Sequence, residues 1–369
     1  MASLTAQHSP GLWALAWRRL RTDRAAMVAL LIVAAYLVTL LLSATGLVAS
    51  NWADEVGVNY APPGFVGTQS TTERGAPPVL LREETPPENP LDPLKDILRE
   101  LRATTSPSAI TVNDYGIADP IAKELAEVRA GLAKTGSKAA VVRKKTLPFG
   151  GDKWGHDIVK KTIKGAETSI VVGLVAAVLA TVLGTIFGAV SGYFGGKIDD
   201  LFNWFYSIFT SVPYLLLVLA VAAVLQQKGV LTIVLILGLT GWTGTYRLIR
   251  AEYLKHKTRE YVWAADAIGA SHWRRIFVHI FPNVSHVALV QVSILVVGFI
   301  KSEVILSFLG FGVPVGTVSW GSMLNEAQNE LILGKWWQLV AASVAMAILV
   351  TAFSLFTDAL RDALDPKLK

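Results

Sequence analysis

Cysteine is absent from the 369 residues, and histidine and methionine are scarce, with six and four residues. The absence of thiols excludes disulfide bridges, thiol catalysis and cysteine-ligated metal sites. Charged residues are also few, at 17%, whereas apolar residues make up 52% of the chain. A composition this apolar and this poor in charge is typical of an integral membrane protein.

Motifs for catalysis and nucleotide binding are missing from the sequence as well. It contains no HExxH, no Walker lysine loop, no GxSxG elbow and no paired carboxylates within an apolar run. Four histidines fall in or beside one polar loop, but neighbours are at least two helical turns, about 10 Å, apart, which is too far to share one ion. These are His256, His272, His279 and His286. We therefore predict no enzymatic activity, no metal site and no cofactor in this chain.

Six long apolar runs are the dominant feature of the sequence. A helix needs about 20 apolar residues to cross the hydrocarbon core of a bilayer. The runs cover 26–49, 168–193, 201–225, 230–248, 284–309 and 337–357. The first is longer than the apolar region of roughly 7–15 residues in a signal peptide. The sequence therefore predicts an all-α membrane protein with six transmembrane helices.

The distribution of basic residues predicts the orientation of these helices. Arg18, Arg19, Arg21 and Arg24 precede the first run, and the loop 247–283 carries seven Lys or Arg against three acids. Cytoplasmic segments are enriched in Lys and Arg, so both segments belong in the cytoplasm, and six spans then place both termini there. The net charge of +6 needs no nucleic-acid partner to explain it.

The predicted organisation follows from this orientation. A cytoplasmic tail, 1–25, precedes the first span, 26–49, and a long extracytoplasmic segment, 50–165. The transmembrane core covers 166–357 and includes the loop 247–283. A second cytoplasmic tail, 358–369, ends the sequence.

The extracytoplasmic segment combines irregular chain with two short amphipathic helices. Residues 61–90 are rich in Pro, Gly, Thr and Glu, which disfavour regular structure. Apolar side chains then recur at helical spacing twice, and Asp119 and Pro120 can begin the second helix. The two stripes are Leu94, Ile97, Leu98 and Leu101, then Ile121, Leu125, Val128 and Leu132. They either cover the chain's own bundle and each other or contact a partner subunit.

Several residues within the apolar runs predict features of the bundle. Glycines at 184, 188, 192 and 196 recur every four residues and would let another helix approach closely, whereas Pro213 should kink the third span. Lys301 and Glu303 are charged, and an ionisable group in a span usually faces a bundle interior or an aqueous cavity. Being two residues apart they point to different faces. We expect them to line an aqueous cavity of the bundle, unless both lie near enough to the outer end to reach the interface.

The polar loop looks like a docking device. It contains the string Tyr-Val-Trp-Ala-Ala-Asp-Ala-Ile-Gly-Ala-Ser at 261–271 and closes on Phe-Pro-Asn at 281–283. Small, helix-favouring alanines can enter a groove of a partner, and the glycine at 269 allows a sharp turn between two short helices. The alternative is an ordinary helical hairpin that packs on its own bundle.

This loop resembles the EAA loop of permease subunits of ATP-binding-cassette (ABC) importers. Ala264-Ala265, then Gly269, then Pro282 thirteen residues later match its spacing. The remaining similarity is to the dipeptide and oligopeptide branch, of the second-permease or C type, and covers 13–49 and 147–369. It includes Trp17-Arg18-Arg19-Leu20, Gly155-His156-Asp157-Ile158-Val159, Gly192-Tyr193-Phe194-Gly195-Gly196, Leu306-Ser307-Phe308-Leu309-Gly310-Phe311-Gly312, Ser319-Trp320-Gly321 and the tail 360–366.

The resemblance implies a multi-pass subunit of the bacterial inner membrane that is one half of a peptide translocation pathway. Its partners would be a second homologous permease, two ATPase subunits that bind ATP and Mg, and an extracytoplasmic substrate-binding protein. The residues expected to couple to an ATPase are Ala264, Ala265, Asp266, Ala267, Gly269, Ala270, Ser271 and Pro282.

Two departures from the family pattern limit this comparison. Trp263 stands where the family has the glutamate that names the loop, so a salt bridge from that position to the ATPase is not expected. The segment 64–146 is much longer than the family usually has, as in members that handle larger peptides or peptide-like antibiotics.

Other functions remain open at the level of sequence. Relatives of this branch also carry nickel chelates, glutathione or sugars. An ion-coupled secondary transporter would show polar residues or broken helices near the midplane of several spans, and this sequence has few. A scaffold anchored in the membrane would need one span rather than six.

Overall fold

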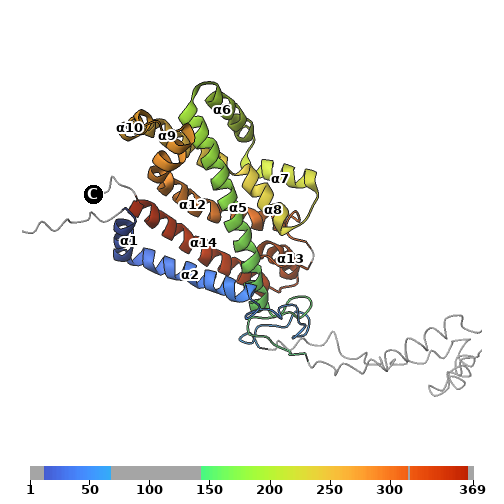
Figure 1. The fold of residues 1–369 in the computed structure, drawn as a ribbon. Helices are drawn as coiled ribbons and strands as arrows, with labels where there is room; N and C mark the ends of the chain where they lie inside the picture. Colours follow the sequence, from blue (N-terminus) through green and yellow to red (C-terminus); the bar gives the residue numbers. More distant parts are fainter. Residues whose placement is uncertain (1–11, 68–142, 315, 365–369) are drawn as a thin grey trace, which may run out of the picture. The chain divides into compact units, whose positions relative to one another are not determined.

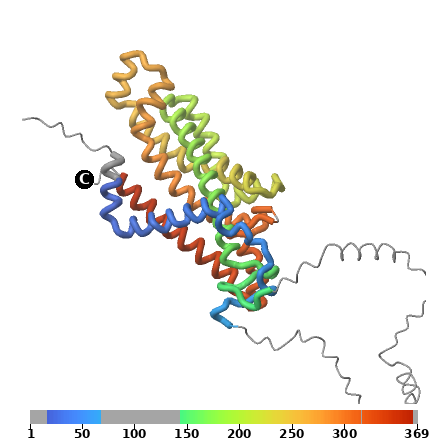
Figure 2. Tube along the Cα trace, turned by 60° about the horizontal axis from the view of Figure 1, so that its bottom comes forward, coloured from blue at the N-terminus to red at the C-terminus, as the bar shows by residue number. Residues whose placement is uncertain are grey.

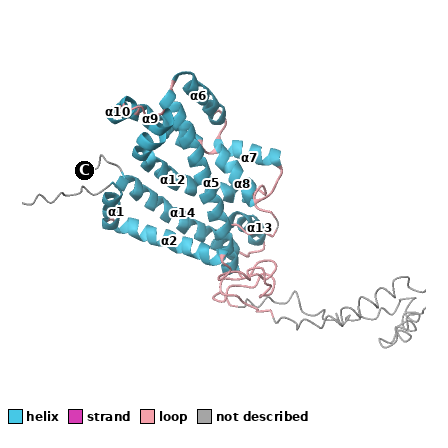
Figure 3. Cartoon of the chain, viewed as in Figure 1, coloured by secondary structure: helices cyan, strands magenta, loops and turns pink. Residues whose placement is uncertain are grey.

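A computed structural model describes residues 12–67, 143–314 and 316–364 of the chain. Within these ranges the protein consists of helices and loops, without a β-strand (Figure 3). The two amphipathic helices predicted between residues 94 and 132 lie outside the described residues.

Among the residues that the structure describes, five helical stretches are long and apolar enough to cross a membrane. They are α2 (Arg24–Ala44), α5 (Ile158–Phe194), α8 with α9 (Val230–Thr240, Thr243–His256), α11 through η1 to α12 (His272–Arg274, Arg275–Ile280, Phe281–Phe308) and α14 (Trp337–Leu364). A sixth candidate is the bent pair α6 (Gly196–Thr210) and α7 (Tyr214–Leu225). The prediction of an all-α membrane protein is thus confirmed.

The helix limits differ from the predicted spans, since polar residues extend some helices and α2 ends earlier than predicted. Asp23 caps α2 by accepting hydrogen bonds from two backbone N–H groups, and the helix ends at Ala44 rather than residue 49. Asp157 likewise caps α5, which begins well before the predicted residue 168. Helix α9 continues to His256, so the polar loop is shorter than the predicted 247–283.

The third apolar run is broken rather than kinked. Proline lacks the N–H group needed for the helical hydrogen bond and its ring clashes with the preceding turn. Helix α6 ends at Thr210, α7 begins directly after Pro213, and their axes differ by 83°. The predicted bend at Pro213 therefore occurs at the expected residue, but it separates two helices instead of kinking one.

Helix α5 packs closely against α9 along a glycine face. A Cβ atom on Gly184, Gly188 or Gly192 would lie 2.7–2.8 Å from atoms of α9, several of them backbone atoms. Gly196 does not share this face, because α5 ends at Phe194 and a Cβ on Gly196 would meet no atom within 4 Å. Including Gly196 among the packing glycines was therefore wrong.

These contacts also fix the relative direction of the two helices. Gly184 faces residues 242–246, Gly188 faces 246–250 and Gly192 faces 250–253, so residue numbers rise together along both helices. Helix α5 and the α8–α9 stretch therefore run in parallel. The chain must return from one end of the bundle to the other between Phe194 and Val230, which is the stretch that contains α6 and α7.

The remaining long helices surround α5. Helix α12 packs antiparallel to it, with Ser169 opposite Glu303 and Gly173 opposite Ile300. Helices α2 and α14 pack against each other through Ala29, Val33 and Ala352, and both can be followed in Figures 1 and 2. Helix α1 (Leu12–Thr22) packs on the end of α14 through Leu20, Ala363 and Leu364.

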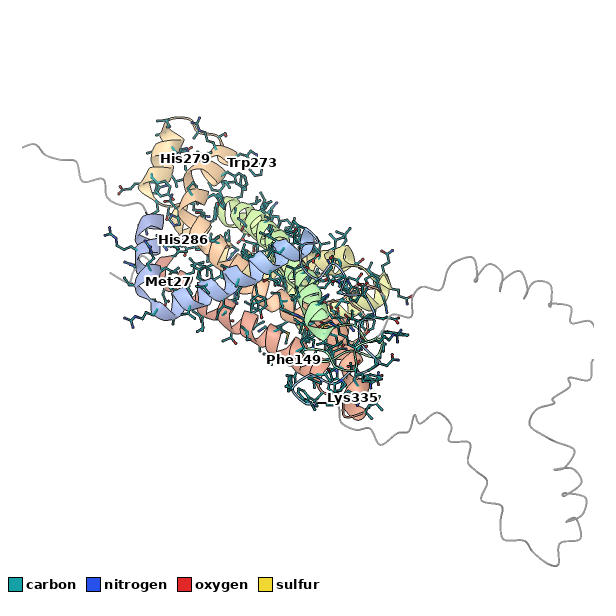
Figure 4. All side chains as sticks on the ribbon, turned by 90° about the horizontal axis from the view of Figure 1, so that it is seen from below. Met27, Phe149, Trp273, His279, His286 and Lys335 are labelled. Atoms are coloured by element: carbon teal, nitrogen blue, oxygen red, sulfur yellow. The ribbon has the colours of Figure 1, made fainter. Side chains whose placement is uncertain are left out.

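The loops at the two ends of the bundle are far apart. Trp273 and His279 lie at one end, and Phe149 and Lys335 lie at the other (Figure 4). At the second end, residues 49–67 and 143–157 form a cap joined by isolated bridges such as Gly57 to Lys144. The Trp337 indole N–H donates to the Gly151 carbonyl at 2.7 Å and so attaches the cap to α14.

Candidate coupling loop and transport face

The polar loop folds as a short helical hairpin. Helix α10 (Glu260–Ala267) is followed by Gly269, whose φ of +81° lies in the left-handed region that favours glycine. Ser271 then caps α11, with its hydroxyl accepting the Arg274 backbone N–H. The structure therefore places two short helices on either side of the glycine turn.

One face of α10 packs on the bundle and the other is open. Val262 and Ala265 are buried, and Val262 joins a cluster with Ile276 and Ile280. On the open face Trp263 is 62% exposed and Ile268, just after the helix, is 82% exposed. The coupling residues predicted from sequence divide accordingly, with Ala264, Asp266, Ala267, Gly269 and Ser271 exposed, Ala270 half-buried and Ala265 buried.

Arg275 fixes the hairpin to the bundle, a role not predicted from the sequence. Its guanidinium group lies 2.6 Å from the Asp266 carboxylate and 2.9 Å from the His272 ring nitrogen. It also lies 5.8 Å from the centre of the Tyr193 ring, at the end of α5. The acid of α10 is thus paired within the chain, and the hairpin is fastened to two other elements.

A π-helical turn, η1, joins the hairpin to α12. Pro282 in the first turn of α12 supplies no N–H group to this junction, and a wider turn accommodates the missing bond. The Ile276 carbonyl accepts the Phe281 N–H and, at 3.1 Å, the hydroxyl group of Tyr253 from α9. Helices α9 and α12 are therefore both bonded to the base of the hairpin.

The two charged residues of α12 have different surroundings. Glu303 is fully buried, and its carboxylate accepts hydrogen bonds from Ser169 at 2.6 Å and Ser307 at 2.7 Å. Ser169 also accepts the Trp320 backbone N–H of α13 (Trp320–Ile332), so Glu303 lies at a packing joint of three helices rather than beside open space in this chain. Lys301 is exposed on another face.

Lys301 belongs to an open strip along α12. Ile294 and Ile305 are exposed, and a Cβ on Gly298 between them would meet no atom within 4 Å. Towards the hairpin the strip continues into a cavity of about 680 Å³ between α9, α12 and α14. Its lining includes Leu248, Glu252, Lys255, His256, Arg259, Asn283, His286, Val287, Gln291, Ile294 and Arg361. We call this strip and cavity the α12 face.

The opposite end of the bundle carries a buried ion cluster. The Lys161 ammonium lies 2.7 Å from Asp152, 2.6 Å from Glu326 and 3.2 Å from the side-chain oxygen of Gln338. These residues come from the cap, α5, α13 and α14, so one ammonium group joins four segments. Burial raises the pKa of Asp152, but the charge and hydrogen bond of Lys161, with His156, outweigh burial and hold it below its usual range.

Glu330, on α13 beside this cluster, is also buried. Neither of its oxygens has a hydrogen-bond partner of normal geometry within the described chain. Burial is the largest influence on its pKa, which rises to about 7; Lys161 and the Lys153 backbone oppose the rise, and Asp152 and Glu326 add to it.

Comparison with known proteins assigns these features to one family. Residues 184–369 match the family described as binding-protein-dependent transport system inner membrane component. Residues 11–63 match the N-terminal transmembrane domain of oligopeptide transport permease C. The first match includes both the hairpin and the α12 face.

Individual relatives agree with this assignment. A dipeptide transport system permease protein of Bacillus subtilis (strain 168) is 38% identical over 221 residues, which are 60% of this chain and 69% of the relative. An oligopeptide transport system permease protein of the same organism is 39% identical over 221 residues, 60% of this chain and 72% of the relative. The oligopeptide permease of Escherichia coli (strain K12) is 36% identical over 219 residues, 59% and 72% of the two chains.

Proposed function

The chain belongs to the family of binding-protein-dependent transport system inner membrane components, as a non-catalytic permease subunit of an ABC importer, and from this premise we propose that it imports peptides. The observation that carries the proposal is identity of 38–39% to dipeptide and oligopeptide permeases over more than two thirds of their length. The protein is a multi-pass component of the inner membrane.

The proposed partners are a second homologous permease, two ATPase subunits and an extracytoplasmic binding protein. ATP with Mg, held by the ATPases, supplies the driving force. The open face of α10, with Trp263 and Ile268, enters a groove of one ATPase. Because Asp266 and Arg275 fasten the hairpin to η1, movement of the ATPase is passed to α12 and α9.

We propose six membrane crossings with both termini in the cytoplasm. The parallel packing of α5 and α9 supports α6 and α7 as one broken crossing. The end of α14 borders the same cavity as Arg259 of the hairpin region, and arginines crowd α1. A cysteine placed at Ser106 should react with an impermeant thiol reagent in cells whose inner membrane is intact; reaction only after that membrane is opened would reverse the topology.

The α12 face is the proposed contribution of this subunit to the translocation pathway. A lysine exposed to lipid within a span costs about 2.5–3.5 kcal/mol on insertion scales. Asn283, His286 and Gln291 on the same side of α12 are also poorly suited to lipid. An aqueous passage between the two permeases accommodates all four residues. Glu303, by contrast, is proposed as a structural joint behind this face.

The extracytoplasmic segment 64–146 is proposed to contact the binding protein or the sister permease. Its sequence has too few large apolar side chains to bury much surface against the entropy of ordering it. Deleting 74–137 should leave assembly with the ATPases intact and weaken uptake. Unchanged uptake would argue for a spacer.

Reconstitution of the purified transporter tests the proposed function. ATPase subunits should co-purify with this chain, and proteoliposomes supplied with ATP and the binding protein should accumulate a dipeptide. A proton ionophore should leave this uptake unchanged. If uptake proceeded without ATP and collapsed with the ionophore, the chain would instead be an ion-coupled transporter.

A further inference from the structure

Lys301 places a positive charge on the α12 face. Its side chain is exposed, and no carboxylate pairs with it among the described residues. The nearest acid in sequence, Glu303, is unavailable because it is fully buried and bonded to Ser169 and Ser307. The ammonium group is therefore free to meet a ligand.

Its depth in the helix argues for a role within the passage. Lys301 lies seven residues before Phe308, the last residue of α12, or about 10 Å along the helix axis. The open position at Gly298 leaves space beside it on the same strip. A charge at this depth, next to space rather than to a packed neighbour, suits a group that solutes pass.

The rest of the α12 face has the same sign of charge. The cavity at its other end is lined by Lys255, Arg259 and Arg361, and Glu252 is the one acid among its lining residues. Lys255 lies 3.1 Å from Glu252, which leaves the two arginines without an acid across the cavity. Such a face attracts anionic groups and repels an ammonium group.

The anionic group common to all unmodified peptides is the carboxylate at the C-terminus. From these observations, and resting on the proposed peptide function, we infer that Lys301 binds the terminal carboxylate of a peptide in transit and so favours free-acid peptides over their amides. A charge-assisted hydrogen bond between ammonium and carboxylate is stronger than one to a neutral amide.

Matched peptides test this inference in the complete transporter. Initial uptake rates of trialanine and trialanine amide are measured in proteoliposomes with saturating binding protein, and the acid-to-amide ratio is compared between variants. Lys301→Gln should lower this ratio about tenfold, the equivalent of one charged hydrogen bond. Lys301→Arg should keep it within about twofold, since the charge remains. Comparing ratios removes the preference of the binding protein, which is the same throughout.

Lys228 supplies the matched control, because it is an exposed lysine in the loop between α7 and α8 and is not among the residues of the α12 face. Lys228→Gln should leave the ratio unchanged. An unchanged ratio in Lys301→Gln, or an equal fall in Lys228→Gln, overturns the inference. If the native transporter imports neither peptide, the proposed function itself fails.

A second variant tests the inference even if Lys301→Gln fails to assemble into the transporter. The chain has no cysteine, so in Lys301→Cys a thiol reagent labels this subunit at one position. A reagent that attaches an aminoethyl group should restore the ratio, whereas a neutral reagent of similar size should not. Equal effects of the two reagents overturn the inference.

Discussion

The two ends of the bundle both expose large apolar side chains but differ in where their charged groups lie. The hairpin end exposes large apolar side chains, with Trp263 and Ile268 more than half exposed. The cap end buries charges, with the Lys161 ammonium enclosed by carboxylates of the cap and α13. An exposed apolar surface is completed by a partner, whereas a buried ion cluster is completed within the chain. The proposed docking surface therefore lies at the end without the buried ion cluster, and the cap end is fastened within the chain.

Removing Lys161 should cause the largest loss of stability, because this residue fastens the cap end. Lys161→Met leaves Asp152 and Glu326 without their buried partner, and breaking such a pair costs about 3–5 kcal/mol. We expect a clear fall in the thermal unfolding temperature of the detergent-purified chain. Lys164→Met is the control, because Lys164 pairs at a partly exposed position with Glu167. Equal stability of the two variants would show that the cap end is not fastened by its ions.

The next largest effect on stability is expected at Glu330, and this effect depends on pH. Its pKa is raised from 4.5 to about 7, so the native state favours the protonated form. This contribution to stability is fully present below about pH 4.5 and is lost as pH rises through 7. Glu330→Gln should therefore unfold near the native temperature at pH 5 and above it at pH 8, where its free energy of unfolding should exceed the native value by about 2 kcal/mol.

Asp152 provides a control, because its pKa is shifted in the opposite direction to that of Glu330. Its pKa is lowered by Lys161, so its contribution is present above its ordinary pKa of 3.8 and is lost as pH falls below that value. Asp152→Asn should destabilise the protein at pH 7 and 8 alike. A native unfolding temperature that did not decline between pH 5 and 8 would contradict the assignment of Glu330.

The cap end also marks the limit of what could be predicted from the sequence. The apolar spans, the bend at Pro213 and the glycine turn at 269 depend on local sequence pattern, and the structure has all three where the sequence predicts them. The ion cluster joins residues 152, 161, 326 and 338, and nothing local in sequence indicates which charges meet. For the same reason burial of Glu303 and the link from Arg275 to Asp266 were missed, since both depend on packing between distant segments.

At the hairpin end, Gly269→Asp should uncouple transport without unfolding the bundle. A side chain at φ of +81° is strained by about 1–2 kcal/mol, although a Cβ there would meet no atom within 4 Å. We expect the variant to insert normally and to show severalfold lower substrate-stimulated ATP hydrolysis and uptake. Gly310→Asp, at a similar φ of +85° but beyond the end of α12, is the control for strain alone. Native rates in Gly269→Asp would exclude a role of this turn in coupling.

The smallest expected effect is at Ile268. Replacing this exposed residue by serine removes an apolar anchor worth about 1 kcal/mol of contact with the ATPase. The dissociation constant of the ATPase subunit from the permease should rise about fivefold, with no change in unfolding temperature. Ile332→Ser, equally exposed at the other end of the bundle, should leave this affinity unchanged. If both variants bind the ATPase as the native chain does, the apolar face of the hairpin is not the docking surface.

The parallel packing of α5 and α9 has a consequence for how the protein is made. Asp199, at the start of α6, lies 2.6 Å from Arg250 of α9, and fifty-one residues separate the two in the chain. During synthesis the carboxylate of Asp199 and the glycine face of α5 both emerge before their partner helix exists. Until α9 arrives, α6 carries an unpaired charge that disfavours entry into lipid, and α5 presents a bare groove. The joint between α5, α6 and α9 is therefore closed only when α9 is made, and this helix fills the groove and pairs the charge together.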